Sequence, residues 1–109
     1  MSGALLVRAG GLPAAPLDAM AGFMAEHAPI VRDSGAAEVV IVFDPADHSH
    51  ARWRRAAVEE LAREAAPHGR VNAIVTSDDA APAAQELLLY LEKAPGVTGQ
   101  VLEVADHGA

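Results

Sequence analysis

The sequence predicts an α/β domain with a four-stranded, all-parallel sheet in the order β-α-β-α-β-α-β. Short apolar runs of strand length alternate with longer segments of helix length, and Gly or Pro stands at most of the boundaries. The strand-length runs are mostly apolar throughout rather than alternating with polar residues, which suits strands buried on both faces. We therefore expect helices on both faces of the sheet and right-handed crossovers between the strands.

The segment 51–75 carries the clearest pattern of helix followed by strand. Between Trp53 and Ala66 there is no Pro or Gly, and the residues are mostly strong helix formers. One stripe of the predicted helix is apolar, made of Trp53, Ala57, Leu61 and Ala65. Pro67 to Gly69 ends the helix, and the run RVNAIV that follows predicts a buried strand.

The other elements are bounded in the same way. Strands are predicted at 4–7, 38–43 and 97–104. Asp18 is expected to cap the first helix, which Pro29 kinks or interrupts before it ends near Gly35. Pro82 suits the first turn of the last helix, which is expected to run to Lys93.

Composition limits the classes of function. The 109 residues are enough for one domain, predicted to span 1–109. Their net charge is -7, so nucleic acid is not expected as a partner. No cysteine is present, which excludes disulfides, thiol catalysis and thiolate metal sites. No apolar run reaches the length of a membrane span, and the first residues do not resemble a signal peptide. We expect a cytoplasmic protein with no membrane contact.

Polar residues follow the predicted strands, where parallel sheets gather functional groups. They form a possible ligand cluster of Asp44, His48, His50 and Asp78. Carboxylates and imidazoles could hold a divalent metal, but their spacing matches no established metal motif, so no metal is assigned. The simpler interpretation is a solvated loop whose Asp or Ser caps the central helix, with Asp78 and Asp79 capping the last helix.

Several apolar side chains are candidates for an interface with another chain. Trp53 is expected to anchor either the core or a contact between helices. The leucines of the last helix spread over more than one of its faces, which is more apolar surface than one small sheet covers. The predicted interface residues are Trp53, Ala57, Leu61, Leu88 and Leu91.

Four segments together resemble the second half of short-chain dehydrogenases/reductases. They are LLVRAGG (5–11), EVVIVFD (38–44), AAVEELAREAAPHGRVNAIV (56–75) and PGVTGQVLEV (95–104). The chain is similar to the C-terminal half of 3-oxoacyl-ACP reductases and to the inactive reductase-like domain of high-molecular-weight actinobacterial forms. The resemblance implies a single truncated Rossmann-like domain, half of a doubly wound fold, from fatty acid or polyketide metabolism.

The residues that the family uses for catalysis are replaced in this sequence. By the resemblance, the catalytic serine falls at Phe43 or Asp44, the tyrosine at Ala51 and the lysine at Arg55. The only tyrosine, Tyr90, lies on the predicted last helix, and no Gly-rich dinucleotide fingerprint is present. The resemblance therefore implies no catalytic set and no cofactor, and a conventional reductase activity is not expected.

The leading hypothesis is a noncatalytic interaction or assembly subunit. In the family, the helix before the serine strand and the central helix form a four-helix dimer bundle, and the last helix and strand form another contact. We therefore expect a homodimer, a higher homo-oligomer, or a pair with a full-length short-chain reductase. One alternative is a small-molecule or metal-binding enzyme that uses the Asp/His cluster, and another is a fragment of a larger protein. The strand at 4–7 is expected at an open sheet edge.

Overall fold

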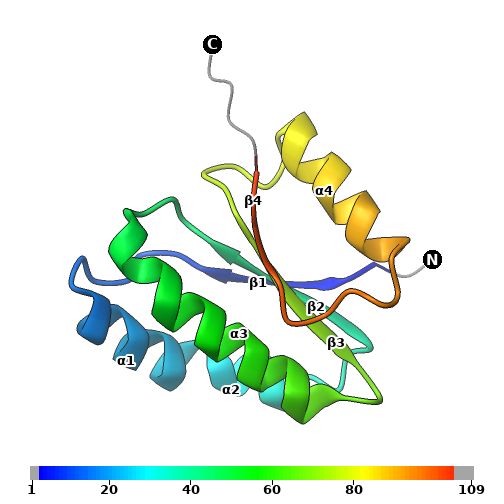
Figure 1. Cartoon of the computed structure of the whole chain (residues 1–109), viewed down its shortest axis with the longest axis horizontal. Coiled ribbons are helices and arrows are strands. Elements are labelled where there is room, and N and C mark those ends of the chain that lie inside the picture. The colour runs from blue at the N-terminus through cyan, green and yellow to red at the C-terminus, as the bar shows by residue number, and fades with distance from the viewer. Residues whose placement is uncertain (1–2, 105–109) are drawn as a thin grey trace.

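A computed structural model describes the chain from residue 3 to residue 104. Its four strands pair in parallel in the order β1-β2-β3-β4, which confirms the predicted α/β class and the all-parallel sheet (Figure 1). The strands are β1 (Leu5–Ala9), β2 (Glu38–Phe43), β3 (Arg70–Val75) and β4 (Val101–Glu103). The first strand lies at one edge of the described sheet, as predicted.

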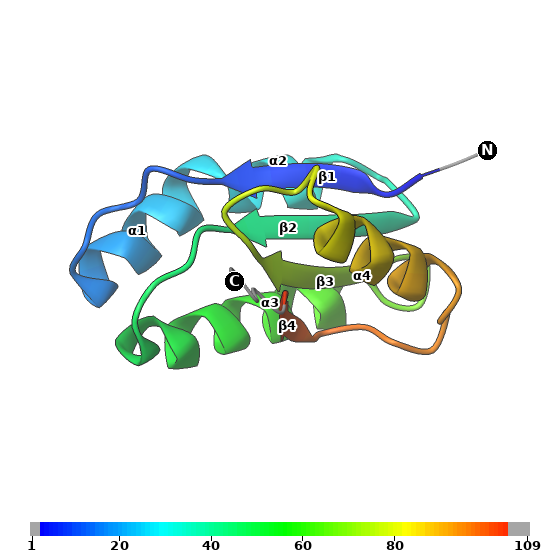
Figure 2. The same cartoon turned by 90° about the horizontal axis from the view of Figure 1, so that it is seen from above.

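Helices cover both faces of the sheet, also as predicted (Figure 2). On one face lie α1 (Pro16–Glu26), α2 (Ala28–Asp33) and α3 (Ala51–Ala65); on the other lies α4 (Pro82–Glu92). A short 3-10 turn, η1 (His48–His50), leads into α3. The predicted interruption near Pro29 is confirmed, since the chain breaks between α1 and α2 at His27. Among these helices none is long and apolar enough to span a membrane.

The prediction that Asp18 caps the first helix is wrong. The cap is Ala15, in an extended conformation, and Pro16 occupies the first turn. Proline suits this place because its ring presets the helical φ and its missing N–H would have no partner there. Asp18 instead lies within the first turn, where a carboxylate interacts favourably with the helix dipole.

The expectation of right-handed crossovers throughout is also wrong. All three connections advance in the same direction across the sheet, yet α3 packs on one face and α4 on the other. Two parallel crossovers that advance in one direction with helices on opposite faces have opposite hands. The connections through α1/α2 and through α3 therefore share one hand, and the last connection, through α4, has the other, left-handed one. Figure 1 shows the segment that leads from the end of α4 back to the start of β4.

The last strand is shorter than the predicted 97–104 because the Asn72 side chain and the left-handed Gly99 (φ 77°) interrupt the regular ladder before it, although the Gly99 N–H still donates to the Val71 carbonyl at 2.7 Å. The Asn72 side chain is fully buried, and its Nδ2 donates to the carbonyl of Val97 at 3.0 Å. Its Oδ1 accepts from the Gln100 N–H at 3.0 Å. The segment 97–100 is therefore fixed to β3 in a non-strand conformation, and regular pairing starts only at Val101.

An aromatic cluster fills the core between the sheet and the three helices of one face. Phe23 from α1 contacts Phe43 from β2 and Trp53 from α3, with ring centroids 5.4 and 5.6 Å apart. Phe43 and Trp53 meet edge to face at 5.7 Å. Such geometries add to the stabilisation from burial. The core interpretation of Trp53 is thus confirmed, and the cluster joins α1, α3 and the end of β2.

Candidate functional site

The predicted Asp/His cluster does not assemble at the carboxyl ends of the strands. His50 is buried, and its Nε2 lies 2.9 Å from the carbonyl oxygen of Ala14. Its Nδ1 accepts a hydrogen bond from Trp53 Nε1 at 3.0 Å. Because the indole N–H can only donate, the imidazole proton sits on Nε2 and bonds Ala14. Both ring nitrogens are thus used within the fold, and His50 is not free to bind a ligand.

The carboxylates of the predicted cluster also accept hydrogen bonds within the fold. Asp44 Oδ2 accepts from the Gly11 N–H at 3.4 Å, and Asp78 Oδ1 accepts from the Ala80 N–H at 2.9 Å. Within residues 3–104 no group of three or more His, Asp or Glu side chains is arranged to hold a metal ion. The hypothesis of a metal site is therefore wrong for the described part of the chain. His48 is exposed and belongs to no such group.

The capping interpretation of this loop is correct only in part. Asp47 caps η1: its carboxylate accepts from the Ser49 N–H at 2.9 Å and from the Ser49 hydroxyl. These two hydrogen bonds hold the pKa of Asp47 below its usual range, and the bond from the Ser49 hydroxyl has the larger effect. The helix that follows, α3, has no side-chain cap of its own. Continuity with η1 takes the place of a cap.

Asp78 and Asp79 do not cap α4, contrary to the prediction. The cap is Ala81, without a side-chain hydrogen bond. Asp79 instead forms an ion pair with Arg8, its Oδ2 lying 2.6 Å from Nε. This pair ties the loop before α4 to the end of β1. The pair neutralises Arg8, which is the one charged side chain of that strand.

The positions that the family uses for catalysis lie in different environments. Phe43 is fully buried in the aromatic cluster, whereas Ala51 and Arg55 are exposed on the first turns of α3. The strand order does not reverse within the described sheet, so it lacks the switch point at which such folds bind dinucleotides. The residues described here therefore do not fit a nicotinamide dinucleotide.

Sequence reasoning missed Arg54, a buried cation beside these positions. Its guanidinium lies over the ring of Phe43, with 4.5 Å from Cζ to the ring centroid. Burial lowers the pKa of Arg54, while the carboxylates of Asp44 and Glu103 act in the opposite direction. Within residues 3–104 its buried Nε has no hydrogen-bond partner. An arginine beside the apolar stripe of a helix is ordinarily exposed, so the sequence carried no signal for this burial.

Arg70, the first residue of β3, was likewise missed. Its Nη1 donates to the carbonyls of Leu91, Ala94 and Val97 at 3.1, 2.9 and 3.2 Å. Its Nη2 lies 3.0 Å from Glu38 Oε2, and both side chains are largely buried. Arg70 thus joins the starts of two neighbouring strands to the end of α4. The signal available in the sequence was an arginine at the start of an otherwise apolar strand.

A wide hollow lies between α1 and α3. It has a volume of about 620 Å³ and a mostly apolar lining that includes Met20 and Met24 from α1 and Ala56 and Ala57 from α3. Met24 is 47% exposed. We call this hollow the α1–α3 groove.

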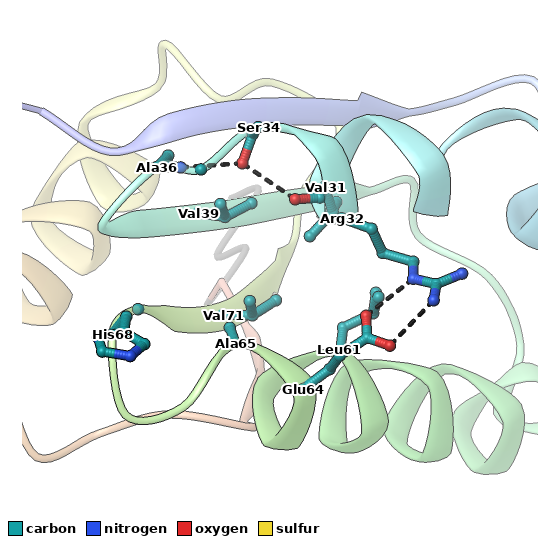
Figure 3. A pocket seen from close by; sticks show the side chains of 12 residues that line it. Val31, Arg32, Ser34, Ala36, Val39, Leu61, Glu64, Ala65, His68 and Val71 are labelled. Atoms are coloured by element: carbon teal, nitrogen blue, oxygen red, sulfur yellow. Dashed lines mark hydrogen bonds and ion pairs between the residues drawn. The ribbon is translucent and has the colours of Figure 1, made fainter.

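Ion pairs border the α1–α3 groove. Arg32 from α2 donates two hydrogen bonds to Glu64 from α3, at 2.8 and 3.0 Å. Arg63 and Glu60 pair at 2.9 Å on the same helix. The Arg32–Glu64 pair also borders a smaller hollow of about 170 Å³ at the amino ends of β2 and β3 (Figure 3). The groove therefore has an apolar floor and charged borders, as interfaces between proteins do.

The predicted interface residues fall into different environments. Trp53, Ala57 and Leu61 line the α1–α3 groove, although Trp53 and Leu61 are mostly buried in the core. Leu88 and Leu91 are both on α4: Leu88 is partly buried against the core beneath that helix, and Leu91 is completely buried in it. Leu91 cannot contribute surface to an interface, so that part of the prediction is wrong. Its burial follows from the inward face of α4, whose outward face instead carries the exposed Leu89 and Tyr90.

Comparison with known families gives one match that covers most of the chain. The model of the SDR-like family, described as short chain dehydrogenase-like protein, matches residues 7–104. Neither curated proteins nor solved structures gave a match. The family match covers β1 from Val7 onward, the other three strands and all four α-helices described above. The chain therefore belongs to the SDR-like family of short-chain dehydrogenase-like proteins.

Proposed function

We propose that this chain is a noncatalytic, reductase-like assembly subunit that pairs through α1 and α3 with a second copy or with a full-length short-chain reductase. The α1–α3 groove is the observation that carries the proposal. Its apolar lining is open to solvent in the single chain, with Met20 and Met24 exposed beside small alanines of α3. Contiguous apolar surface of this kind marks contact sites between proteins.

Small residues on α3 support a contact with another helix. Ala56 and Ala57 line the groove, and short side chains let a second helix approach closely. Methionine adapts its shape to irregular partners, so Met20 and Met24 suit a surface that accepts either of the two proposed partners. The ion pairs at the borders of the groove would then form the polar rim.

The noncatalytic part of the proposal is supported by the sequence positions. Ala51 and Arg55 stand where the resemblance puts tyrosine and lysine, and alanine has no proton to donate to a substrate carbonyl. Arginine keeps the charge of lysine but not its hydrogen-bond geometry. We also propose that its relatives are the 3-oxoacyl-ACP reductases, that it belongs to fatty acid or polyketide metabolism and that it is cytoplasmic.

The first test is the mass of the native complex isolated from its source cells. A second copy, or a co-purifying chain recognisable as an intact reductase, is the expected result. A monomer at micromolar concentration whose mass does not change on adding a cognate reductase would overturn the proposal.

A pair of variants then tests the groove itself. Met24→Glu places a charge on the exposed apolar lining, and we expect it to release the partner. Leu89→Glu is the matched control, because Leu89 is 52% exposed on α4, away from the groove. Both variants need circular dichroism spectra equal to those of the parent. Equal loss of the partner in both, or loss in neither, contradicts the groove as the contact site.

A further inference from the structure

The outer edge of β1 is the longest unpaired strand edge of the described sheet. Within residues 3–104, β1 pairs only with β2, and β4 pairs only with β3. β1 has five residues, whereas β4 has three and ends on the exposed Glu103. Backbone N–H and C=O groups on such an edge need partners, and another strand supplies them best.

β1 carries few of the devices that normally protect a strand edge. It contains no proline and no glycine, and its residues are in regular register with β2. Its one charged residue, Arg8, is paired with Asp79 at 2.6 Å. Leu5, at the start of the strand, is 38% exposed. An edge that is regular and mostly apolar favours strand addition.

The two faces of β1 show which side chains a partner strand would meet. Val7 and Ala9 are buried in the core under α1 and α2, which places Leu5 on the same face by the alternation of strands. Leu6 packs toward the core under α4, and Arg8 reaches Asp79 just before that helix. A partner strand therefore needs apolar residues on the face of α1 and α2 and can tolerate one charge on the other.

From these contacts we infer that β1 pairs antiparallel with β1 of a second copy, making one continuous sheet across a two-fold axis at Val7. This is the register in which all five residues of both copies pair. It places Leu5 opposite Ala9 of the second copy and Leu6 opposite its Arg8. No like charges lie directly opposite, and each Arg8 keeps its own Asp79. Self-pairing is isologous, so it closes after two copies.

This edge contact is independent of the α1–α3 groove, and a cysteine variant tests it directly. The natural chain has no cysteine, so Val7→Cys introduces a single thiol at the two-fold axis. Residues directly opposite in an antiparallel pair have Cα atoms about 4.5–5.5 Å apart, within the range that a disulfide spans. Under mild oxidation we expect Val7→Cys to form a disulfide-linked dimer.

Leu89→Cys is the control for this experiment. Its thiol is more exposed than that of Val7→Cys, so it measures cross-linking by random collision. A yield for Val7→Cys no greater than that for Leu89→Cys would overturn the inference. Repeating the experiment with the double variant Val7→Cys/Met24→Glu separates the two proposals. Cross-linking that persists in the double variant shows an edge contact that does not need the groove. Loss of cross-linking in the double variant shows that the edge alone does not pair.

A second variant tests the edge contact without cross-linking. Leu5→Lys adds an unpaired charge to the exposed strand end, and we expect it to weaken self-association through the edge about tenfold in Kd. Leu89→Lys makes the same change on α4 and should leave the Kd unchanged. Sedimentation equilibrium across a concentration series measures both. Equal Kd values for Leu5→Lys and the parent, with Val7→Cys not cross-linked, would refute edge pairing.

Discussion

Arg70 offers the sharpest test of how this fold is held together, through the variant Arg70→Ala. The guanidinium joins Glu38 on β2 to the carbonyls that end α4. The variant removes the cation from Glu38, whose side chain is only 14% exposed. A carboxylate left without its partner at such a site pays the full cost of desolvation.

The size of the effect follows from what remains after truncation. Each of the three carbonyls keeps a second donor: the Ala94 N–H for Leu91, the Val97 N–H for Ala94, and Asn72 Nδ2 for Val97. The loss therefore comes mainly from Glu38 and not from the carbonyls. Removing one partner of a buried pair costs 3–5 kcal/mol, and partial exposure here puts the expected loss near the lower end, at about 3 kcal/mol. A domain of this size has about 5–15 kcal/mol in total.

Urea unfolding and hydrogen exchange measure this prediction. The free energy of unfolding should fall by about 3 kcal/mol, and the Tm by about 12 °C. Exchange should accelerate most at the end of α4, which Arg70 fixes to the sheet. A double variant with Glu38→Gln should lose less than the sum of the single variants, since the orphaned charge is then absent.

The control for Arg70 is Arg63→Ala. Arg63 pairs with Glu60 at 2.9 Å, but both side chains are about 70% exposed, at 71% and 69%. Exposed pairs of this kind contribute little, so the expected loss is at most about 0.5 kcal/mol. An Arg70→Ala variant no less stable than Arg63→Ala would refute the reasoning, as would faster exchange spread evenly over all helices.

Two further predictions concern the carboxyl ends of the strands. Ser49→Ala removes the hydroxyl that chiefly lowers the pKa of Asp47, so this pKa should rise toward its ordinary value. A carbon-13 NMR titration of the carboxylate measures the pKa, and an unchanged pKa contradicts the assigned cause. Because the lowered pKa favours the folded state above the unfolded value of about 3.9, that contribution is lost only as the pH falls through the folded pKa, and Ser49→Ala moves the loss to higher pH. Arg54→Met keeps an unbranched side chain over Phe43 and removes a buried charge, so the free energy of unfolding should stay equal or rise by about 1 kcal/mol; a loss above about 2 kcal/mol in urea unfolding would show that the charge itself is stabilising.

The sequence by itself determined the class of fold because its signals are local. The β-branched run at 38–43 and the apolar run at 70–75 need only their own composition to predict buried strands. Proline sets its effect on its own turn, so Pro29 predicted the break between α1 and α2, and Pro82 predicted the start of α4. The family match over residues 7–104 agrees with the resemblance seen in the motifs.

Only the tertiary structure decided the fate of the polar residues, because their partners lie far away in the sequence. His50 bonds the carbonyl of Ala14, Asp79 pairs with Arg8, and Arg70 bonds the end of α4. None of these contacts follows from local spacing, so a pattern that resembled a ligand cluster became structural hydrogen bonds. The hand of the last connection was also decided globally, since it depends on which face α4 covers and not on any residue within it.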